Sequence, residues 1–165
     1  MNTQESIYER GDWIVHARYG VGQVREMEKK KLDGAQKEFL RVRTSDSEYW
    51  LSLSRTDAEY IRPVTSEYKI NKALRMIRKA PKELPEKHSE RIKVINEAIN
   101  DPSVYTKARM IRDLNGKEQE TKLNFTEEDA LIKMRKQFLD EWSVIKDVDR
   151  SILEEKLNKA LNISN

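Results

Sequence analysis

The side chains that could do chemistry in this chain are mostly cationic, and they gather in one segment. Residues 64–93 carry 9 lysines and arginines against 4 acidic residues, a net charge of +5, whereas residues 1–63 are neutral and residues 94–165 carry −2. Such an excess attracts phosphate groups over about one Debye length, ~8 Å at physiological salt. The segment therefore favours contact with a phosphate backbone, with a merely solvated helix surface as the alternative interpretation.

The candidate phosphate contacts share helical spacing. Lys72, Arg75 and Lys79 recur at i, i+3 and i+7, which places them on one face of a helix. Nothing here resembles an isolated recognition helix that offers Arg, Asn or Gln to base edges, so we expect contact that tolerates any sequence. The basic residues that we predict to contact DNA are Arg75, Lys79, Lys87, Arg91 and Lys93.

Catalytic chemistry has few suitable residues. The chain has no cysteine and only two histidines, His16 and His88, which excludes thiol catalysis, disulfides and cysteine-based zinc sites. Gly20-Val21-Gly22 lacks the Gly-Lys-Ser/Thr that completes a phosphate-binding loop. We therefore expect no enzyme, no catalytic residue, no cofactor and no metal, and we interpret His16 as a residue that fixes the glycine turn after a strand.

Residues 1–63, which include His16 and the glycine turn, have the pattern of a small β-structure. Short runs rich in β-branched and aromatic residues alternate with turn signals at Tyr19-Gly20-Val21-Gly22, Leu32-Asp33-Gly34 and Ser45-Asp46-Ser47. This punctuation predicts about five strands of a small antiparallel barrel. Leu40-Arg41-Val42-Arg43 and Leu51-Ser52-Leu53-Ser54 alternate between apolar and polar residues, so one face of the barrel is expected to be solvated.

The remaining residues change to a helical period. Apolar residues three and four apart predict five helices, with Pro85 opening the second, Thr126 capping the fourth and Asp149 capping the fifth. The expected ranges are roughly 66–80, 85–100, 103–122, 126–146 and 149–162. The sequence thus predicts an α+β chain of two domains, residues 1–63 and 64–165. Its apolar runs are too short for a membrane span, and we expect a cytoplasmic monomer.

The run Gly11-Asp12-Trp13-Ile14-Val15-His16-Ala17-Arg18-Tyr19-Gly20-Val21-Gly22-Gln23-Val24 resembles the opening signature of the CarD/CdnL family of bacterial transcription regulators. Residues 34–40 and 58–63 resemble later parts of the same module, which transcription-repair coupling factors also carry. In its small size and its helical second half, the chain resembles the regulators rather than the coupling factors.

This resemblance implies a Tudor-like domain that binds the RNA polymerase β subunit through a sheet edge, a mode that suits an exposed edge strand. A family arginine of the fourth strand falls on Ser52, and another falls on Lys30. Arg41, Arg43 and Arg55 can substitute for them. The polymerase-binding residues expected from the resemblance are therefore Lys30, Arg41, Arg43, Ser52 and Arg55.

The resemblance also implies a helical domain that contacts promoter DNA at the upstream edge of the transcription bubble, in a nucleoid-associated protein. The family places a tryptophan there as a wedge in the minor groove, which stabilises the open complex. In this chain the wedge position falls on His88, and Arg91 and Lys93 match the basic positions that follow it. The alternative is a protein-interaction adaptor on RNA polymerase that does not touch DNA.

Overall fold

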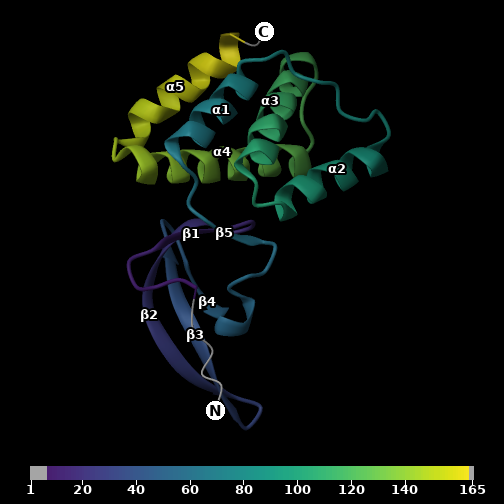
Figure 1. Cartoon of the computed structure of the whole chain (residues 1–165). Coiled ribbons are helices and arrows are strands. Elements are labelled where there is room, and N and C mark those ends of the chain that lie inside the picture. Colours follow the sequence, from purple (N-terminus) through teal and green to yellow (C-terminus); the bar gives the residue numbers. More distant parts are fainter. Residues whose placement is uncertain (1–6, 164–165) are drawn as a thin grey trace.

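The computed structural model describes residues 7–163 and shows a sheet followed by five helices, which confirms the α+β class (Figure 1). The five strands form one antiparallel sheet in the order β4-β3-β2-β1-β5. The strands and a short 3₁₀ helix are β1 (Trp13–His16), β2 (Gly20–Leu32), β3 (Ala35–Thr44), β4 (Glu48–Ser52), η1 (Leu53–Arg55) and β5 (Ile61–Pro63). We call these elements together the sheet unit.

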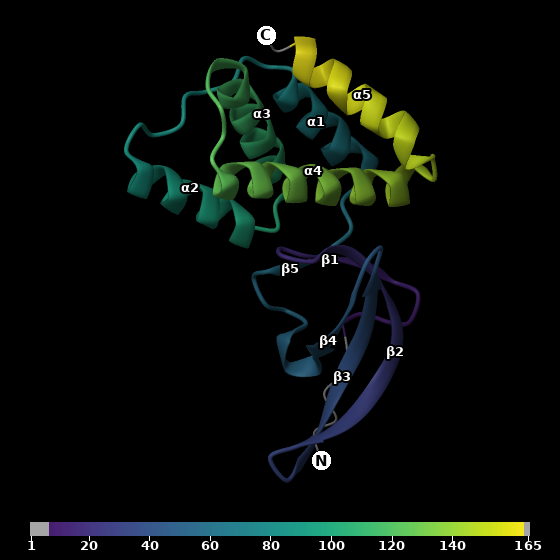
Figure 2. The same cartoon turned by 180° about the vertical axis from the view of Figure 1, so that it is seen from behind.

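The helices follow β5 without a further strand and form what we call the helix unit. They are α1 (Glu67–Ile77), α2 (His88–Asn100), α3 (Val104–Glu120), α4 (Phe125–Lys146) and α5 (Arg150–Ile163). In both views α4 crosses the end of the helix unit that faces the sheet (Figures 1 and 2). Among residues 7–163, no helix is both long and apolar enough to cross a membrane.

The sheet unit owes its shape to a long hairpin. β2 and β3 pair from Gly22↔Thr44 to Leu32↔Ala35, whereas β4 pairs with β3 only over residues 39–43. Asp33 and Gly34 close the hairpin with φ angles of +51° and +79°, the pair of left-handed residues that a two-residue type I′ turn requires. The predicted turn is therefore confirmed, and the hairpin projects beyond β4 as a two-stranded ribbon.

Alternation along the strands builds the core of the sheet unit. Val24, Leu40, Val42 and Leu51 are almost fully buried, while their neighbours on the strands face outward. The alternating stretch Leu51-Ser52-Leu53-Ser54 is not strand throughout. β4 ends at Ser52, because the Ser52 hydroxyl accepts a hydrogen bond from the backbone N–H of Ser54 (3.3 Å) and starts η1 there.

Two helix starts differ from the sequence prediction. α2 begins at His88 rather than at Pro85, because its first backbone hydrogen bond runs from Arg91 N to Lys87 O. α4 is capped by Asn124 rather than Thr126. The Asn124 side chain accepts from Glu127 N (2.9 Å) while the Glu127 carboxylate accepts from Asn124 N (3.2 Å), which is a capping box.

The core of the helix unit lies between α1, α3, α4 and α5. Its fully buried side chains include Ile70, Ile111, Phe138 and Leu157, one from each of these helices. Burial of a side chain of this size contributes about 1.5–3 kcal/mol. The core therefore holds α4 firmly, and α4 in turn presents one face toward the sheet unit.

Candidate functional site

The outer edge of the sheet unit is strand β4. Its only partner in the sheet is β3, so within the described chain the other side of its backbone pairs with no strand. An unpaired strand edge offers backbone N–H and C=O groups to an added strand.

The face beside this edge carries a compact cluster of charges around Arg41. The Arg41 guanidinium lies 2.7 Å from a Glu48 oxygen and 3.2 Å from a Glu28 oxygen, and the hydrogen bond to Glu48 raises its pKa further above the usual range. Arg43 reaches the same Glu48 oxygen at 3.3 Å. The structure therefore brings together two of the predicted polymerase contacts, but it surrounds Arg41 with carboxylates.

A tryptophan that the sequence analysis did not select completes this face. Trp50 is 42% exposed, its indole N–H donates to Glu28 (2.8 Å), and the Lys30 ammonium lies 3.8 Å from its ring centroid. The signal was present in the sequence, because Trp50 stands between the inward residues Tyr49 and Leu51 and must point outward. We call Lys30, Arg41, Arg43 and Trp50 the edge face.

The remaining predicted polymerase contacts lie where β4 ends. Ser52 is half-buried and caps η1, and Arg55 is the exposed last residue of η1. No contact in the structure tests their role, so these positions stay predictions.

The predicted DNA contacts divide between two places. Lys87, His88 and Lys93 are exposed on the first turns of α2 or just before it, whereas Arg75 is exposed on α1 and Lys79 just beyond its end. In both views α3 lies between α1 and α2 (Figures 1 and 2). The predicted DNA contacts therefore lie on two helices that are not neighbours, with α3 between them.

Arg91 differs from its basic neighbours because it is used inside the fold. Its side chain is 13% exposed and lies 3.3 Å from the almost fully buried Glu127 carboxylate. It also donates to the carbonyl oxygens of Pro85 (3.0 Å) and Glu86 (2.9 Å). Arg91 thus fastens the connection before α2 to α4, and a role in DNA contact stays a prediction that this engagement weakens.

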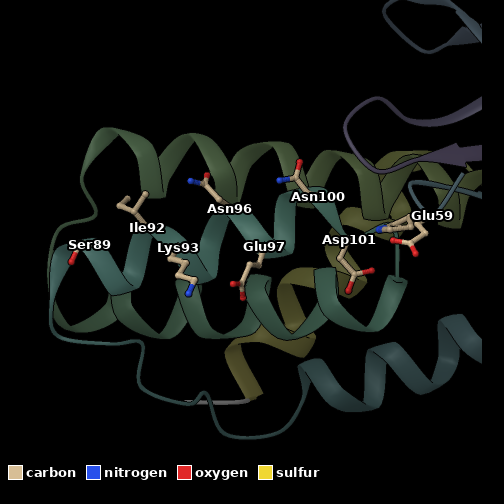
Figure 3. Close-up of a pocket in the computed structure, with 9 residues that line it drawn as sticks. Glu59, Ser89, Ile92, Lys93, Asn96, Glu97, Asn100 and Asp101 are labelled. Atoms are coloured by element: carbon tan, nitrogen blue, oxygen red, sulfur yellow. The ribbon is translucent and has the colours of Figure 1, made fainter.

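A polar groove runs along the exposed face of α2 toward the sheet unit (Figure 3). Its volume is about 710 Å³. Lys93, Asn96 and Asn100 line it from α2. Three carboxylates, those of Glu59, Glu97 and Asp101, line it as well. Like charges repel, so this groove does not extend the basic start of α2 as a surface for phosphates.

The two units are joined by a buried ion pair. The Arg62 guanidinium on β5 binds both carboxylate oxygens of Glu141 on α4, each at 2.7 Å. Thr65 N donates to the same carboxylate (2.8 Å), and Arg62 Nε donates to Pro102 O (2.7 Å). Because Glu141 is only 3% exposed, this bidentate pair fixes both the distance and the orientation of β5 on α4.

A second buried cation joins the units beside that pair. The Lys107 ammonium on α3 donates to three carbonyl oxygens, those of Ala17, Ala98 and Ile99, at 2.9–3.1 Å. The pKa of Lys107 is lowered to about 8, mainly by burial, with Asp101 opposing the shift and Arg62 and Arg18 adding to it. The three carbonyls use all three ammonium protons, so Lys107 connects the glycine turn to the end of α2.

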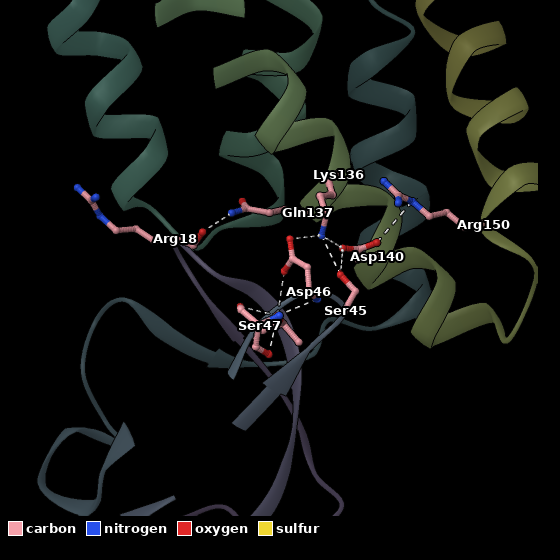
Figure 4. Close-up of polar contacts among 9 residues, drawn as sticks. Arg18, Ser45, Asp46, Ser47, Lys136, Gln137, Asp140 and Arg150 are labelled. Carbon is pink, nitrogen blue, oxygen red and sulfur yellow. Dashed lines mark hydrogen bonds and ion pairs between the residues drawn. The ribbon is translucent and has the colours of Figure 1, made fainter. Parts of the chain in front are cut away.

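Polar side chains at the margin of the junction complete it (Figure 4). Lys136 on α4 donates to Ser45 and Asp140, each at 2.8 Å, and Gln137 donates to Arg18 O (2.8 Å). Coulombic attraction to Lys136 is the largest cause that lowers the pKa of Asp46. Both turns of the sheet unit that point toward the helices are therefore bound to α4.

The glycine turn is shaped by this junction. Gly20 has a φ of +77°, and a Cβ there would lie 3.1 Å from the Gln137 side chain of α4. His16 Nδ1 accepts from Arg18 N (3.0 Å), which confirms that this histidine fixes the turn. Burial lowers the pKa of His16 to about 4, with Arg18 and Lys107 adding to the shift, so His16 is neutral near pH 7.

The structure therefore presents two surfaces on one body. They are the edge face and the exposed residues Lys87, His88 and Lys93 at the start of α2, which we call the α2 surface. Neither of them assembles a nucleophile, a base and a third group that orients the base, which nucleophilic catalysis requires. The arrangement is suited to holding two binding partners at a fixed distance and angle.

Two family models match the chain. Residues 8–65 match the CarD-like/TRCF RID domain, and residues 72–158 match the CarD C-terminal domain. The first match covers the sheet unit with its glycine turn and the edge face. The second begins within α1 and ends within α5.

Proposed function

Because this chain belongs to the CarD-like family of non-enzymatic transcription factors that interact with RNA polymerase, we propose a division of labour between its two units. The sheet unit, residues 1–63, binds the polymerase β subunit. The helix unit, residues 64–165, contacts promoter DNA near the upstream edge of the bubble and alters the stability of the open complex. The protein acts as a monomer.

The observation that carries the polymerase half of this proposal is the free edge of β4 with Trp50 beside it. An added strand would obtain backbone hydrogen bonds from β4, and side chains on the same face would supply specificity. Trp50 is exposed, and its indole is held by Glu28 and Lys30. A large ring that is fixed before binding loses little entropy on binding, which is typical of an interface hot spot.

Substitution of Trp50 tests this half directly. Trp50→Ala is expected to weaken co-purification with polymerase at least tenfold, since truncation of a hot-spot residue costs about 2 kcal/mol or more. Trp13→Ala is the matched control, because Trp13 on β1 is similarly exposed (37% against 42%) but lies outside the edge face. Equal loss in both variants, or loss in neither, places the polymerase interface elsewhere.

The DNA half is supported by the exposed basic residues at the start of α2. Lys87, His88 and Lys93 have no ion-pair partner among residues 7–163 and face solvent. Tethering to polymerase raises the local concentration of this surface at the promoter, so contacts that are weak in isolation suffice.

Salt dependence of DNA binding tests this half. Lys87→Ala with Lys93→Ala should lower the magnitude of the log–log salt slope by about 0.9 for each phosphate contact that is lost. Lys122→Ala with Lys133→Ala, two exposed lysines outside the α2 surface, should leave the slope unchanged. If the α2 pair also leaves it unchanged, the adaptor that does not touch DNA is the better description. The internal role of Arg91 and the separation of α1 from α2 favour that second candidate.

A further inference from the structure

A pocket of about 440 Å³ lies between α1, α4 and α5, away from both surfaces described above. In both views α2 lies at the opposite side of the helix unit from α5, and the sheet unit lies beyond α4 (Figures 1 and 2). The floor of the pocket is apolar and consists of Leu74, Trp142 and Ala160, one residue from each of the three helices. The volume falls within the range of about 300–1,000 Å³ that is usual for sites of small ligands.

Four cations and no carboxylate line the walls of this pocket, namely Arg78, Lys146, Lys156 and Lys159. Lys146 is paired with Glu67, which lies outside the pocket lining. Within residues 7–163 the other three form no ion pair. Arg78 follows the last turn of α1, where the carbonyl end of the helix attracts a cation. Lys156 and Lys159 lie along α5, and no interaction of this kind is described for them. Like charges around one cavity repel one another, and an anion between them removes that repulsion.

The apolar floor is built around the ring of Trp142. Trp142 is 3% exposed and contacts Phe138 edge to face at 5.9 Å between ring centroids. Its indole N–H is buried and has no acceptor among the described residues, so the part of Trp142 that the pocket offers to a ligand is apolar.

We propose that this pocket binds a small organic phosphate, with the phosphates between the four cations and an apolar or aromatic portion on the floor. Cations without acids select a polyanion, and the apolar floor favours a ligand that carries more than phosphate. The volume limits its size to that of a small molecule. A nucleic-acid duplex presents its phosphates on a convex surface and would touch only the rim.

Calorimetric titration of the full chain with pyrophosphate and with adenosine 5′-diphosphate tests the proposal. Both probes should bind, and the nucleotide should bind more tightly because it also covers the floor. Lys156→Glu with Lys159→Glu should weaken nucleotide binding at least tenfold. The matched control, Lys31→Glu with Lys37→Glu, changes the net charge equally at the exposed hairpin and should alter the affinity less than twofold.

Three results would overturn the proposal. They are the absence of binding by either probe, equal weakening in the hairpin control, and displacement of the nucleotide by a DNA duplex whose own binding depends on Lys156 and Lys159. The last result would make the pocket rim a backbone contact instead. The four substituted lysines, Lys31, Lys37, Lys156 and Lys159, are all exposed, so both paired variants should fold, and circular dichroism of each is the check.

Discussion

The ion pair between Arg62 and Glu141 should dominate the coupling of the two units. The Glu141 carboxylate accepts three hydrogen bonds, two from Arg62 and one from Thr65 N, and is 3% exposed. Glu141→Ala leaves the guanidinium with carbonyl partners only, and Arg62→Ala leaves a buried carboxylate with one donor. Removal of one partner from a buried pair costs about 3–5 kcal/mol, so either variant should lose that much free energy of unfolding.

Replacement of both partners should cost far less. Arg62→Met with Glu141→Leu removes both charges and fills the space with apolar atoms, which leaves no ion unpaired. We expect a loss of about 2 kcal/mol, well below the sum of the single variants, because the two residues act as one unit. Urea unfolding followed by fluorescence gives the three values. The exposed pair Asp129 and Lys133, 2.9 Å apart, is the control and should contribute less than about 1 kcal/mol.

The same variants separate stability from function. Polymerase binding should survive in the double variant, because the edge face is not touched. Any effect on the open complex should fall, because the helix unit is then held against the sheet unit without the bidentate pair, by contacts such as those of Lys107, Lys136 and Gln137. Strict additivity of the two single variants would refute the cooperative pair. An unchanged effect on the open complex in the double variant would refute the rigid coupling.

Three further predictions follow from single residues. Burial lowers the pKa of His16 to about 4, well below its ordinary value, so as the pH falls the unfolded chain binds the proton first. The free energy of unfolding should therefore fall by about 1–2 kcal/mol between pH 6.5 and 4.5, and His16→Asn should flatten this part of a melting-temperature profile. Gly116→Ala should destabilise α3 by about 1–3 kcal/mol in urea unfolding, because its Cβ would lie 2.5 Å from Pro81 Cβ, and a variant as stable as the parent would contradict this contact. His88→Trp should lengthen the lifetime of the open complex about tenfold if the larger ring adds ~1.4 kcal/mol, while His88→Ala should shorten it. If neither changes the lifetime of complexes that still contain the protein, His88 is an ordinary first residue of α2.

Local features of the fold were predictable because they depend on neighbouring residues. Asp33-Gly34 specifies a tight turn through the φ angles that it tolerates, and the change of period after residue 63 marks the passage from strands to helices. The start of α2 was less predictable. The Arg91 side chain donates to the carbonyl oxygens of Pro85 and Glu86 and is held by Glu127 on α4, a partner far along the chain that the residues of the first turn do not reveal.

The candidate surfaces were predicted only in part. Lys87, His88 and Lys93 are exposed as expected, but Arg91 has the same charge in the sequence and a different fate in the fold. The difference arises because the buried Glu127 carboxylate on α4 binds the Arg91 side chain. The two tryptophans Trp50 and Trp142 likewise differ in exposure, because Trp50 is exposed on β4 whereas Trp142 is buried in the helix unit.

Residue types at short spacing were enough to predict the order of strands and helices along the chain, the glycine turn and the family. The contacts between Arg62 and Glu141, and between Lys107 and the Ala17 carbonyl oxygen, could be found only in the folded chain. Such partners are far apart in the chain, and their pairing depends on how the sheet packs against α4. The physical reason is that a charge is placed by local backbone geometry, but its partner, and therefore its effect, is chosen by the packing of distant elements.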